Sequence, residues 1–294
     1  MAKVLITGGA GFIGRHCARE FLDAGWEVRL FDCVPIEEED PLVKSGCSVQ
    51  NGDVRDEQAV ELAMEDCDAI VHLAAVVSVP QSMEDPDGTM DINVRGTRNI
   101  LNASQRLNLS HVIIASSAAV YGDSDAIPIP ESAPLIPQSP YAVSKIVGEE
   151  LLRRSQIQTC ALRFFNVYGP NQTGSGGYAA VIPAFKNAVE SGNQCTVFGD
   201  GTQVRDFIHV SDLVRIIGLA IETDELPSEL NVASGEGTTL LQLIEILADS
   251  NKDMQEPVFE EERPGDIHTS LADISLLKST LDIGDMIGIS EGLL

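Results

Sequence analysis

A glycine-rich segment near the N-terminus, 5–14 (LITGGAGFIG), constrains the fold more than any other part of the chain. The run from Lys3 to Thr7 is aliphatic and β-branched, which predicts a buried strand that ends at the glycines. From Phe12 to Ala24 apolar residues recur at helical spacing, so a helix should follow at once. The glycines then lie where a strand passes into a helix N-terminus, whose unpaired N–H groups attract phosphate.

The spacing of these glycines predicts a dinucleotide site. Gly9, Gly11 and Gly14 match GxGxxG, in which small residues permit the turn, backbone approach to a pyrophosphate, and helix packing. Gly8, Gly11 and Gly14 fit a second spacing of the same motif. The next predicted strand ends at Asp32, 18 residues after Gly14, where an acid would bind the adenosine ribose and repel a 2′-phosphate. We therefore expect NAD rather than NADP; the alternative is a glycine turn followed by an ordinary strand-end aspartate.

Predicted strands alternate with predicted helices through the first half of the chain. Buried-strand patterns at Ala69–Leu73 and Val112–Ser116 lie on either side of a helical stretch from about Gly88 to Leu107. This alternation predicts an α/β fold with a doubly wound parallel sheet of the Rossmann type. Its ligand should lie at the carboxyl ends of the strands.

The lengths of the predicted loops and strands change beyond about Asn166. Loops become longer and strands shorter, as at Glu229–Val232, which we assign to a second lobe. We predict an NAD-binding domain over 1–165, joined by parts of about 200–225. Residues 166–294 should form a smaller mixed α/β lobe that binds the substrate.

Composition narrows the possible partners and compartments. The 294 residues carry a net charge of −26 with only six lysines, which argues against nucleic acid and anionic membrane surfaces as partners. No apolar run approaches the roughly 18 residues of a membrane helix, and a strand beginning at Lys3 leaves no room for a signal peptide. The six cysteines lack CxxC or metal-type spacing, which predicts free thiols in a reducing compartment and no metal site. We expect a cytoplasmic protein.

A second motif, in the middle of the chain, carries acid–base chemistry. Ser139 and Pro140 predict a helix start, so Tyr141 and Lys145 should lie one turn apart on one face. A tyrosine with its usual pKa of about 10 is a poor base at neutral pH. A lysine ammonium and an oxidised nicotinamide would both stabilise its phenolate. The alternative is a half-buried helical pair, but this motif follows a predicted strand that ends near Ser117.

Together these motifs resemble the extended short-chain dehydrogenase/reductase family and, within it, the UDP-hexose 4-epimerases. The matching segments are 8–14, Asp32, 116–122, 141–145 and 163–170. The resemblance implies that Ser117 hydrogen-bonds the sugar 4-hydroxyl, Tyr141 removes its proton, and Lys145 holds the nicotinamide ribose and lowers the Tyr141 pKa. Hydride would move from C4 to NAD and return to the other face of a 4-keto sugar.

The resemblance also implies the cofactor contacts. Besides Tyr141 and Lys145, they are Gly8, Gly11, Phe12, Ile13, Gly14, Asp32, Asp53, Val54, Leu73, Ala74 and Ala75. The chain departs from the family at Cys33, where an asparagine is usual. That change should weaken contacts to adenosine without abolishing them.

The resemblance also implies a UDP-sugar site, whose diphosphate and uridine contacts lie in the second half of the chain. Residues implied to bind substrate are Ser78, Ser117, Tyr141, Asn166, Val181, Phe198, Arg205, Arg263, Asp266 and Ser270. Arg205 and Arg263 would bind the diphosphate with Asn166, because guanidinium groups suit phosphate oxygens. Val181 and Phe198 would pack around uracil, and Asp266 would bind the uridine ribose.

Ser270 matches the residue that gates the sugar pocket in the family. A small residue there leaves room for a 2-N-acetyl group, which favours UDP-GlcNAc/UDP-GalNAc over UDP-glucose/UDP-galactose alone. Dehydratases of the family carry an Asp-Glu pair where this chain has Ala118 and Ala119, so elimination is not expected. The alternatives are epimerisation of another nucleotide sugar, such as UDP-glucuronate or a dTDP-hexose, and a non-catalytic sensor. The resemblance also implies a homodimer formed by the helices near 88–107 and 140–154.

Overall fold

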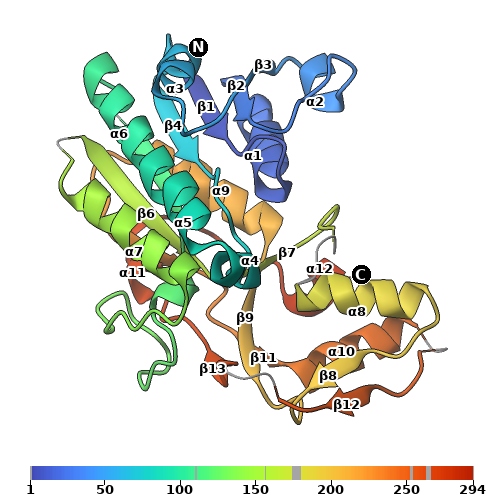
Figure 1. The fold of residues 1–294 in the computed structure, drawn as a ribbon. Helices are drawn as coiled ribbons and strands as arrows, with labels where there is room; N and C mark the ends of the chain where they lie inside the picture. The colour runs from blue at the N-terminus through green and yellow to red at the C-terminus, as the bar shows by residue number, and fades with distance from the viewer. Residues whose placement is uncertain are drawn as a thin grey trace.

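The computed structural model describes residues 2–109, 111–155, 157–173, 180–251, 254–262 and 266–293. A seven-stranded sheet forms its centre, in the order β10-β6-β5-β4-β1-β2-β3 (Figure 1). Each neighbouring pair in this order is parallel. The strands are β1 (Lys3–Thr7), β2 (Glu27–Asp32), β3 (Ser48–Asn51), β4 (Ala69–His72), β5 (His111–Ser117), β6 (Gln158–Phe164) and β10 (Glu229–Val232). The predicted doubly wound parallel sheet is confirmed.

Helices cover both faces of this sheet. On one face lie α1 (Phe12–Asp23) and α9 (Val210–Ile221); on the other lie α3 (Glu57–Met64), α6 (Gly96–Leu107) and α7 (Pro140–Arg153) (Figure 1). Strand β1 shows why its sequence is continuously apolar: Val4 and Ile6 belong to the core under α1, and Leu5 belongs to the core on the opposite face. Among the described residues no helix is long and apolar enough to cross a membrane.

The helix predicted from about Gly88 is interrupted in the structure. It comprises α5 (Pro86–Met90), a π-helical turn (Asp91–Arg95) and then α6, with α4 (Val79–Glu84) before them. Asp85 separates α4 from α5, because Pro86 cannot continue a helix and the Asp85 carboxylate caps α5 through the Gly88 N–H (2.9 Å). These departures come from local turn chemistry within a correctly predicted helical region.

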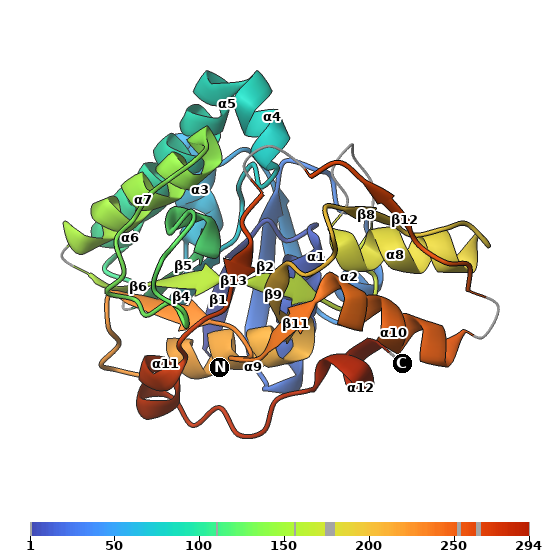
Figure 2. The ribbon, with the colours of Figure 1, turned by 90° about the horizontal axis from the view of Figure 1, so that it is seen from below.

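Short strands and helices form a second region, which lies below the central sheet in Figure 1 and extends to the right in Figure 2. Four strands make one small sheet: β7 (Asn166–Tyr168), β9 (Val204–His209), β11 (Gly237–Thr239) and β13 (Thr269–Ser270). Strands β8 (Thr196–Phe198) and β12 (Val258–Glu260) pair separately. The helices of this region are α8 (Val181–Glu190), α10 (Leu240–Ser250) and α12 (Ile289–Leu293). The remaining short helices, α2 (Pro41–Lys44), η2 (Ala118–Val120) and α11 (Ser275–Thr280), pack against the core of the central sheet. Phe185, Cys195, Phe207 and Leu243 are buried together in this region.

One strand lies where the sequence did not place it. The strand predicted at Glu229–Val232 forms with those bounds, but it pairs with β6 as the edge of the central sheet. Its assignment to the second lobe was therefore wrong. A four-residue strand with buried Leu230 and Val232 fits either sheet by pattern, and only the long-range pairing with β6 decides between them.

Candidate active site

The glycine turn after β1 has the geometry of a phosphate cradle. Gly8 has φ +71°, and a Cβ on Gly14 would overlap the carbonyl oxygen of Gly8, so both positions require glycine. Gly11 donates its N–H to the Gly8 carbonyl (3.0 Å) and begins α1 with no side-chain cap. The first-turn N–H groups of α1, at Phe12 and Ile13, are therefore not occupied by a capping side chain.

Asp32 connects the end of β2 to this turn. Its carboxylate accepts hydrogen bonds from the backbone N–H of Ala10 and of Val34, both at 2.9 Å. Cys33 beside it is exposed. Asp32, the residue predicted to bind a ribose, is thus held next to the glycine turn by the N–H of Ala10, which belongs to that turn.

The other predicted cofactor residues lie at the same edge of the sheet. Leu73, Ala74 and Ala75 follow β4, and the Ala74 N–H donates to the Thr7 hydroxyl (3.2 Å) at the end of β1. Asp53 and Val54 follow β3. Val54 is buried, whereas Asp53 forms a surface ion pair with Arg55 (2.6 Å), whose hydrogen bond lowers the Asp53 pKa. The carboxyl ends of four neighbouring strands thus carry these residues.

Ser117, Tyr141 and Lys145 come together two strands away from the glycine turn. Ser117 ends β5, and Ser139 caps α7 by accepting from the Ala142 N–H (3.2 Å), as predicted from the sequence. Tyr141 and Lys145 are 8% and 9% exposed, and the Lys145 Nζ lies 5.7 Å from the Tyr141 ring centroid. The Lys145 Nζ also donates to the Ala115 carbonyl (2.8 Å).

Burial dominates the protonation of this pair. Burial raises the pKa of Tyr141, and a side-chain hydrogen bond with Ser117 acts in the opposite direction. Burial lowers the pKa of Lys145 to about 8, against the attraction of the Glu149 carboxylate. The three side chains therefore form one small, largely dry acid–base unit.

The sequence analysis missed the buried polar residues that surround this unit. Glu149 lies one turn after Lys145 and is paired with Arg163 of β6 (2.7 Å). Asn93, in the π-helical turn, hydrogen-bonds the Val76 backbone and the Ser144 hydroxyl. One sequence feature could have indicated them: Arg163 is a charged residue inside the apolar run 160–165 (CALRFF). A charged side chain in a buried strand requires a buried partner.

Part of the predicted substrate site assembles on the small sheet. Arg205 of β9 donates to the Asp266 carboxylate (2.6 Å), and Ser270 of β13 lies opposite Arg205 in the strand register. The Asn166 amide donates to the Asp206 carbonyl (3.1 Å). Arg263 lies outside the described residues, so the second predicted arginine is not located here.

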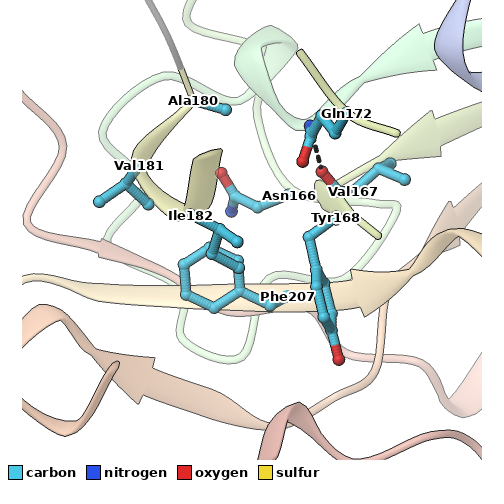
Figure 3. Close-up of a pocket in the computed structure, with 8 residues that line it drawn as sticks. All are labelled: Asn166, Val167, Tyr168, Gln172, Ala180, Val181, Ile182 and Phe207. Carbon is cyan, nitrogen blue, oxygen red and sulfur yellow. Dashed lines mark hydrogen bonds between the residues drawn. The ribbon is translucent and has the colours of Figure 1, made fainter. Parts of the chain in front are cut away.

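A cavity of about 250 Å³ opens beside Asn166 (Figure 3). Its lining residues are Asn166, Val167, Tyr168, Gln172, Ala180, Val181, Ile182 and Phe207. Figure 3 shows Asn166 and Val181 on either side of the space, with Phe207 below them. Phe198, on β8, does not line this cavity within the described part of the chain, and Ser78 caps α4 through the Gln81 N–H (3.2 Å). An amide among apolar and aromatic walls suits a flat, polar-edged ring.

Comparisons with known proteins identify the family of this chain. The family model described as "NAD dependent epimerase/dehydratase family" matches residues 4–233. UDP-glucose 4-epimerase of Lactobacillus helveticus is 33% identical over 83% of this chain and 80% of its own length.

Two solved structures are similar over almost the whole chain. UDP-N-acetylglucosamine 4-epimerase from Methanobrevibacter ruminantium M1, in complex with UDP-N-acetylmuramic acid, has 34% identity and a TM-score of 0.92 over 99% of this chain and 96% of that one. An NAD-dependent NDP-hexosamine 5,6-dehydratase of tunicamycin biosynthesis has 32% identity and a TM-score of 0.88 over 100% and 95%. This chain is therefore a member of the NAD-dependent epimerase/dehydratase family.

Proposed function

We propose that this protein is an NAD-dependent 4-epimerase of a UDP-sugar. The observation that carries the proposal is the juxtaposition of Ser117, Tyr141 and Lys145 at the carboxyl end of β5, in the same parallel sheet as the glycine turn. A tyrosine beside a buried lysine is an acid–base pair that can take a proton from a sugar hydroxyl and return it.

The glycine turn fits the dinucleotide that this chemistry needs. A Cβ at Gly14 would overlap the Gly8 carbonyl oxygen and disrupt the turn, the start of α1 offers uncapped N–H groups, and Asp32 lies beside both. Gly8, Gly11 and Gly14 would hold the pyrophosphate and Asp32 the adenosine ribose. The chemistry that NAD would supply in this site is a hydride acceptor and donor for C4 of the sugar.

The chain's own residues move the proton. Tyr141 Oη takes the proton of the 4-hydroxyl as the C4 hydride leaves, and it returns that proton to O4 when the 4-keto group is reduced. Ser117 Oγ orients the hydroxyl, and the Lys145 ammonium stabilises the phenolate of Tyr141. Epimerisation follows because the ketone can be reduced on either face.

A 5,6-dehydratase among the similar structures makes elimination of water the competing reaction. Ala118 and Ala119 follow Ser117 directly, and neither can act as an acid or a base. Their side chains favour simple reduction of the 4-keto sugar over loss of water from C5 and C6.

The substrate proposal rests on the small sheet and its cavity. Arg205 would bind the diphosphate, with Arg263 as its predicted partner, and Asp266 would bind the uridine ribose. Val181 and Asn166 would contact uracil and the phosphates from the cavity. Ser270, opposite Arg205, leaves room for a 2-N-acetyl group, which favours UDP-GlcNAc/UDP-GalNAc.

We further propose that the protein is a cytoplasmic homodimer. Val79 and Met83 on α4 and Val143 on α7 are exposed, and these two helices contact one another. Pairing of the helices over 86–107 and 140–153 with those of a second copy would cover Val143, next to α4. A monomer mass at micromolar concentration in light scattering would contradict the dimer.

Proton NMR of the purified protein with UDP-GlcNAc or UDP-glucose, without added reductant, tests the reaction. We expect new H-4 signals of the galacto epimers, including UDP-GalNAc. Conversion of UDP-glucose alone would contradict the role of Ser270. New alkene protons would indicate a dehydratase. No change with NAD bound would direct the assay to UDP-glucuronate and dTDP-hexoses, and failure of all of these would leave a sensor.

A further inference from the structure

A buried ion pair lies directly behind the candidate catalytic residues. Glu149 of α7 is 0% exposed and Arg163 of β6 is 2% exposed. The Arg163 Nε and Nη2 donate to the two Glu149 carboxylate oxygens at 2.9 and 2.7 Å, a bidentate geometry. The Ser116 hydroxyl donates to the same carboxylate at 2.6 Å. Glu149 thus accepts three short hydrogen bonds from two strands, and the Arg153 guanidinium of its own helix lies 3.5 Å from it.

The remaining guanidinium nitrogen of Arg163, Nη1, also forms hydrogen bonds. It donates to the Tyr121 hydroxyl and to the Glu131 carbonyl, both at 2.9 Å. The Tyr121 hydroxyl donates to the Asn231 amide oxygen on β10 (2.6 Å). We call Ser116, Tyr121, Glu149, Arg163 and Asn231 the Glu149 cluster. The cluster joins α7 to β5, β6 and β10 through satisfied polar contacts.

Two members of the Glu149 cluster adjoin the candidate catalytic residues. Ser116 immediately precedes Ser117 on β5, and Glu149 lies one helical turn after Lys145 on α7. A buried ion pair usually contributes little net stability, because desolvation offsets the attraction. Its presence here is better explained by orientation: it fixes the helix that carries Tyr141 and Lys145 against the strand that carries Ser117.

We propose that Glu149 is a positioning residue that holds α7 against the end of β5 and keeps Lys145 cationic. This inference rests on the proposed function of Ser117, Tyr141 and Lys145. It extends that function to a residue that touches neither the predicted substrate site nor the glycine turn.

The charges around Lys145 make the second part of this inference testable. Tyr141 and Glu149 face it from α7, and His72 approaches from β4 with a pKa that burial and Lys145 lower to about 3, so His72 is neutral. Glu149 is the anion that raises the Lys145 pKa against burial. Without the Glu149 charge, Lys145 should lose its proton at a lower pH. Above that pH, Tyr141 would no longer have a cationic neighbour.

The direct test is a titration of Lys145 by NMR, which does not depend on turnover. The chain has only six lysines, so protein labelled with ¹³Cε-lysine gives few signals, and Lys145→Met assigns one of them. We expect the Lys145 midpoint to fall by roughly one pH unit in Glu149→Gln, since a nearby opposite charge shifts a pKa by about that much or more. The alkaline limb of the kcat profile should move with it, while KM changes little.

A second variant allows for the chance that Glu149→Gln leaves Arg163 buried without a counter-charge and fails to fold. Glu149→Gln/Arg163→Met removes both charges and keeps apolar bulk. It should fold and show a lowered Lys145 midpoint, by less than in Glu149→Gln, because loss of the Arg163 cation acts in the opposite direction. Glu150→Gln is the matched control, because Glu150 is the next residue on α7 but pairs with Arg153 and Arg154 at the surface. It should leave the midpoint unchanged.

The outcomes separate this inference from the proposed function. An unchanged Lys145 midpoint in the folded double variant overturns the role of Glu149, whatever the activity. A lowered midpoint in both the double variant and Glu150→Gln also overturns it, because the effect would not be specific to the buried carboxylate. A lowered midpoint confined to Glu149 variants supports the inference even if no UDP-sugar is epimerised, in which case the proposed function alone fails.

Discussion

The two halves of the candidate active site are built in different ways. At the glycine turn, Asp32 and the residues after β4 are positioned by the backbone at the carboxyl ends of adjacent parallel strands. On the small sheet, Arg205 and Asp266 meet through their side chains although they are 61 residues apart in the chain. The first half depends on local geometry and the second on long-range packing, so the second should be easier to change by substitution.

Two buried carboxylates sharpen this contrast. Glu149, beside the catalytic trio, is neutralised by Arg163. Asp206, beside Arg205, is also 0% exposed, and its partners in the described part of the chain are all neutral: the Ser234 N–H and hydroxyl, and the N–H groups of Gly235 and Ala272. Burial raises the pKa of Asp206 despite those bonds. We therefore expect the small-sheet half to be the more sensitive to pH.

The largest effect should come from Tyr141→Phe. Loss of the phenol removes the proton acceptor, so we expect kcat to fall by about 10²–10⁴-fold. NAD content, measured by absorbance after denaturation, should stay at the wild-type level because the glycine turn is untouched. Unchanged turnover in this variant would contradict the proposed mechanism.

Ser270→Tyr should change the substrate preference. A bulky side chain opposite Arg205 would fill the space proposed for the 2-N-acetyl group, so kcat/KM for UDP-GlcNAc should fall by roughly 10–200-fold. Turnover of UDP-glucose should fall much less, and Ser270→Ala should retain both substrates. Equal losses on both substrates in Ser270→Tyr would show that residue 270 does not discriminate between them.

Arg205→Met should weaken binding of the diphosphate. A charge-assisted hydrogen bond contributes about 1.5–3 kcal/mol, so KM for the UDP-sugar should rise about ten- to a hundredfold. Arg215→Met is the matched control, because Arg215 also forms an aspartate pair, with Asp212 at 2.6 Å, on α9. If KM rises equally in both variants, the effect is a general loss of packing and not loss of a phosphate contact.

The smallest effect should be a change in the pH dependence of stability. The folded-state pKa of Asp206 is raised above its unfolded value, so its contribution is fully present below the unfolded pKa and is lost as pH rises through the folded pKa. Asp206→Asn cannot ionise. Its stability relative to wild type, measured by urea unfolding from pH 4 to 7, should therefore improve as pH rises. A difference independent of pH would mean that Asp206 does not titrate with folding.

Local patterns predicted much of the fold. Strand β1, the glycine turn and the start of α7 at Ser139 agree with the structure, because each depends on residues within a few positions of one another. Between α4 and α6 the observed helix boundaries differ from the predicted ones, because Asp85 and Pro86 form a helix cap. The spacing of apolar residues does not reveal such a cap. The sheet that contains β10 could not be read from its four residues, since both candidate sheets bury such a strand.

The sequence by itself determined the cofactor cradle, the Tyr141–Lys145 pair and the parallel α/β class, because short-range spacing fixes each of them. Only the tertiary structure decided which distant charges meet: Arg205 with Asp266, and Glu149 with Arg163 and Ser116. The physical reason is that a buried charge requires a partner but does not specify which one. The identity of the partner depends on which strands become neighbours in the folded protein.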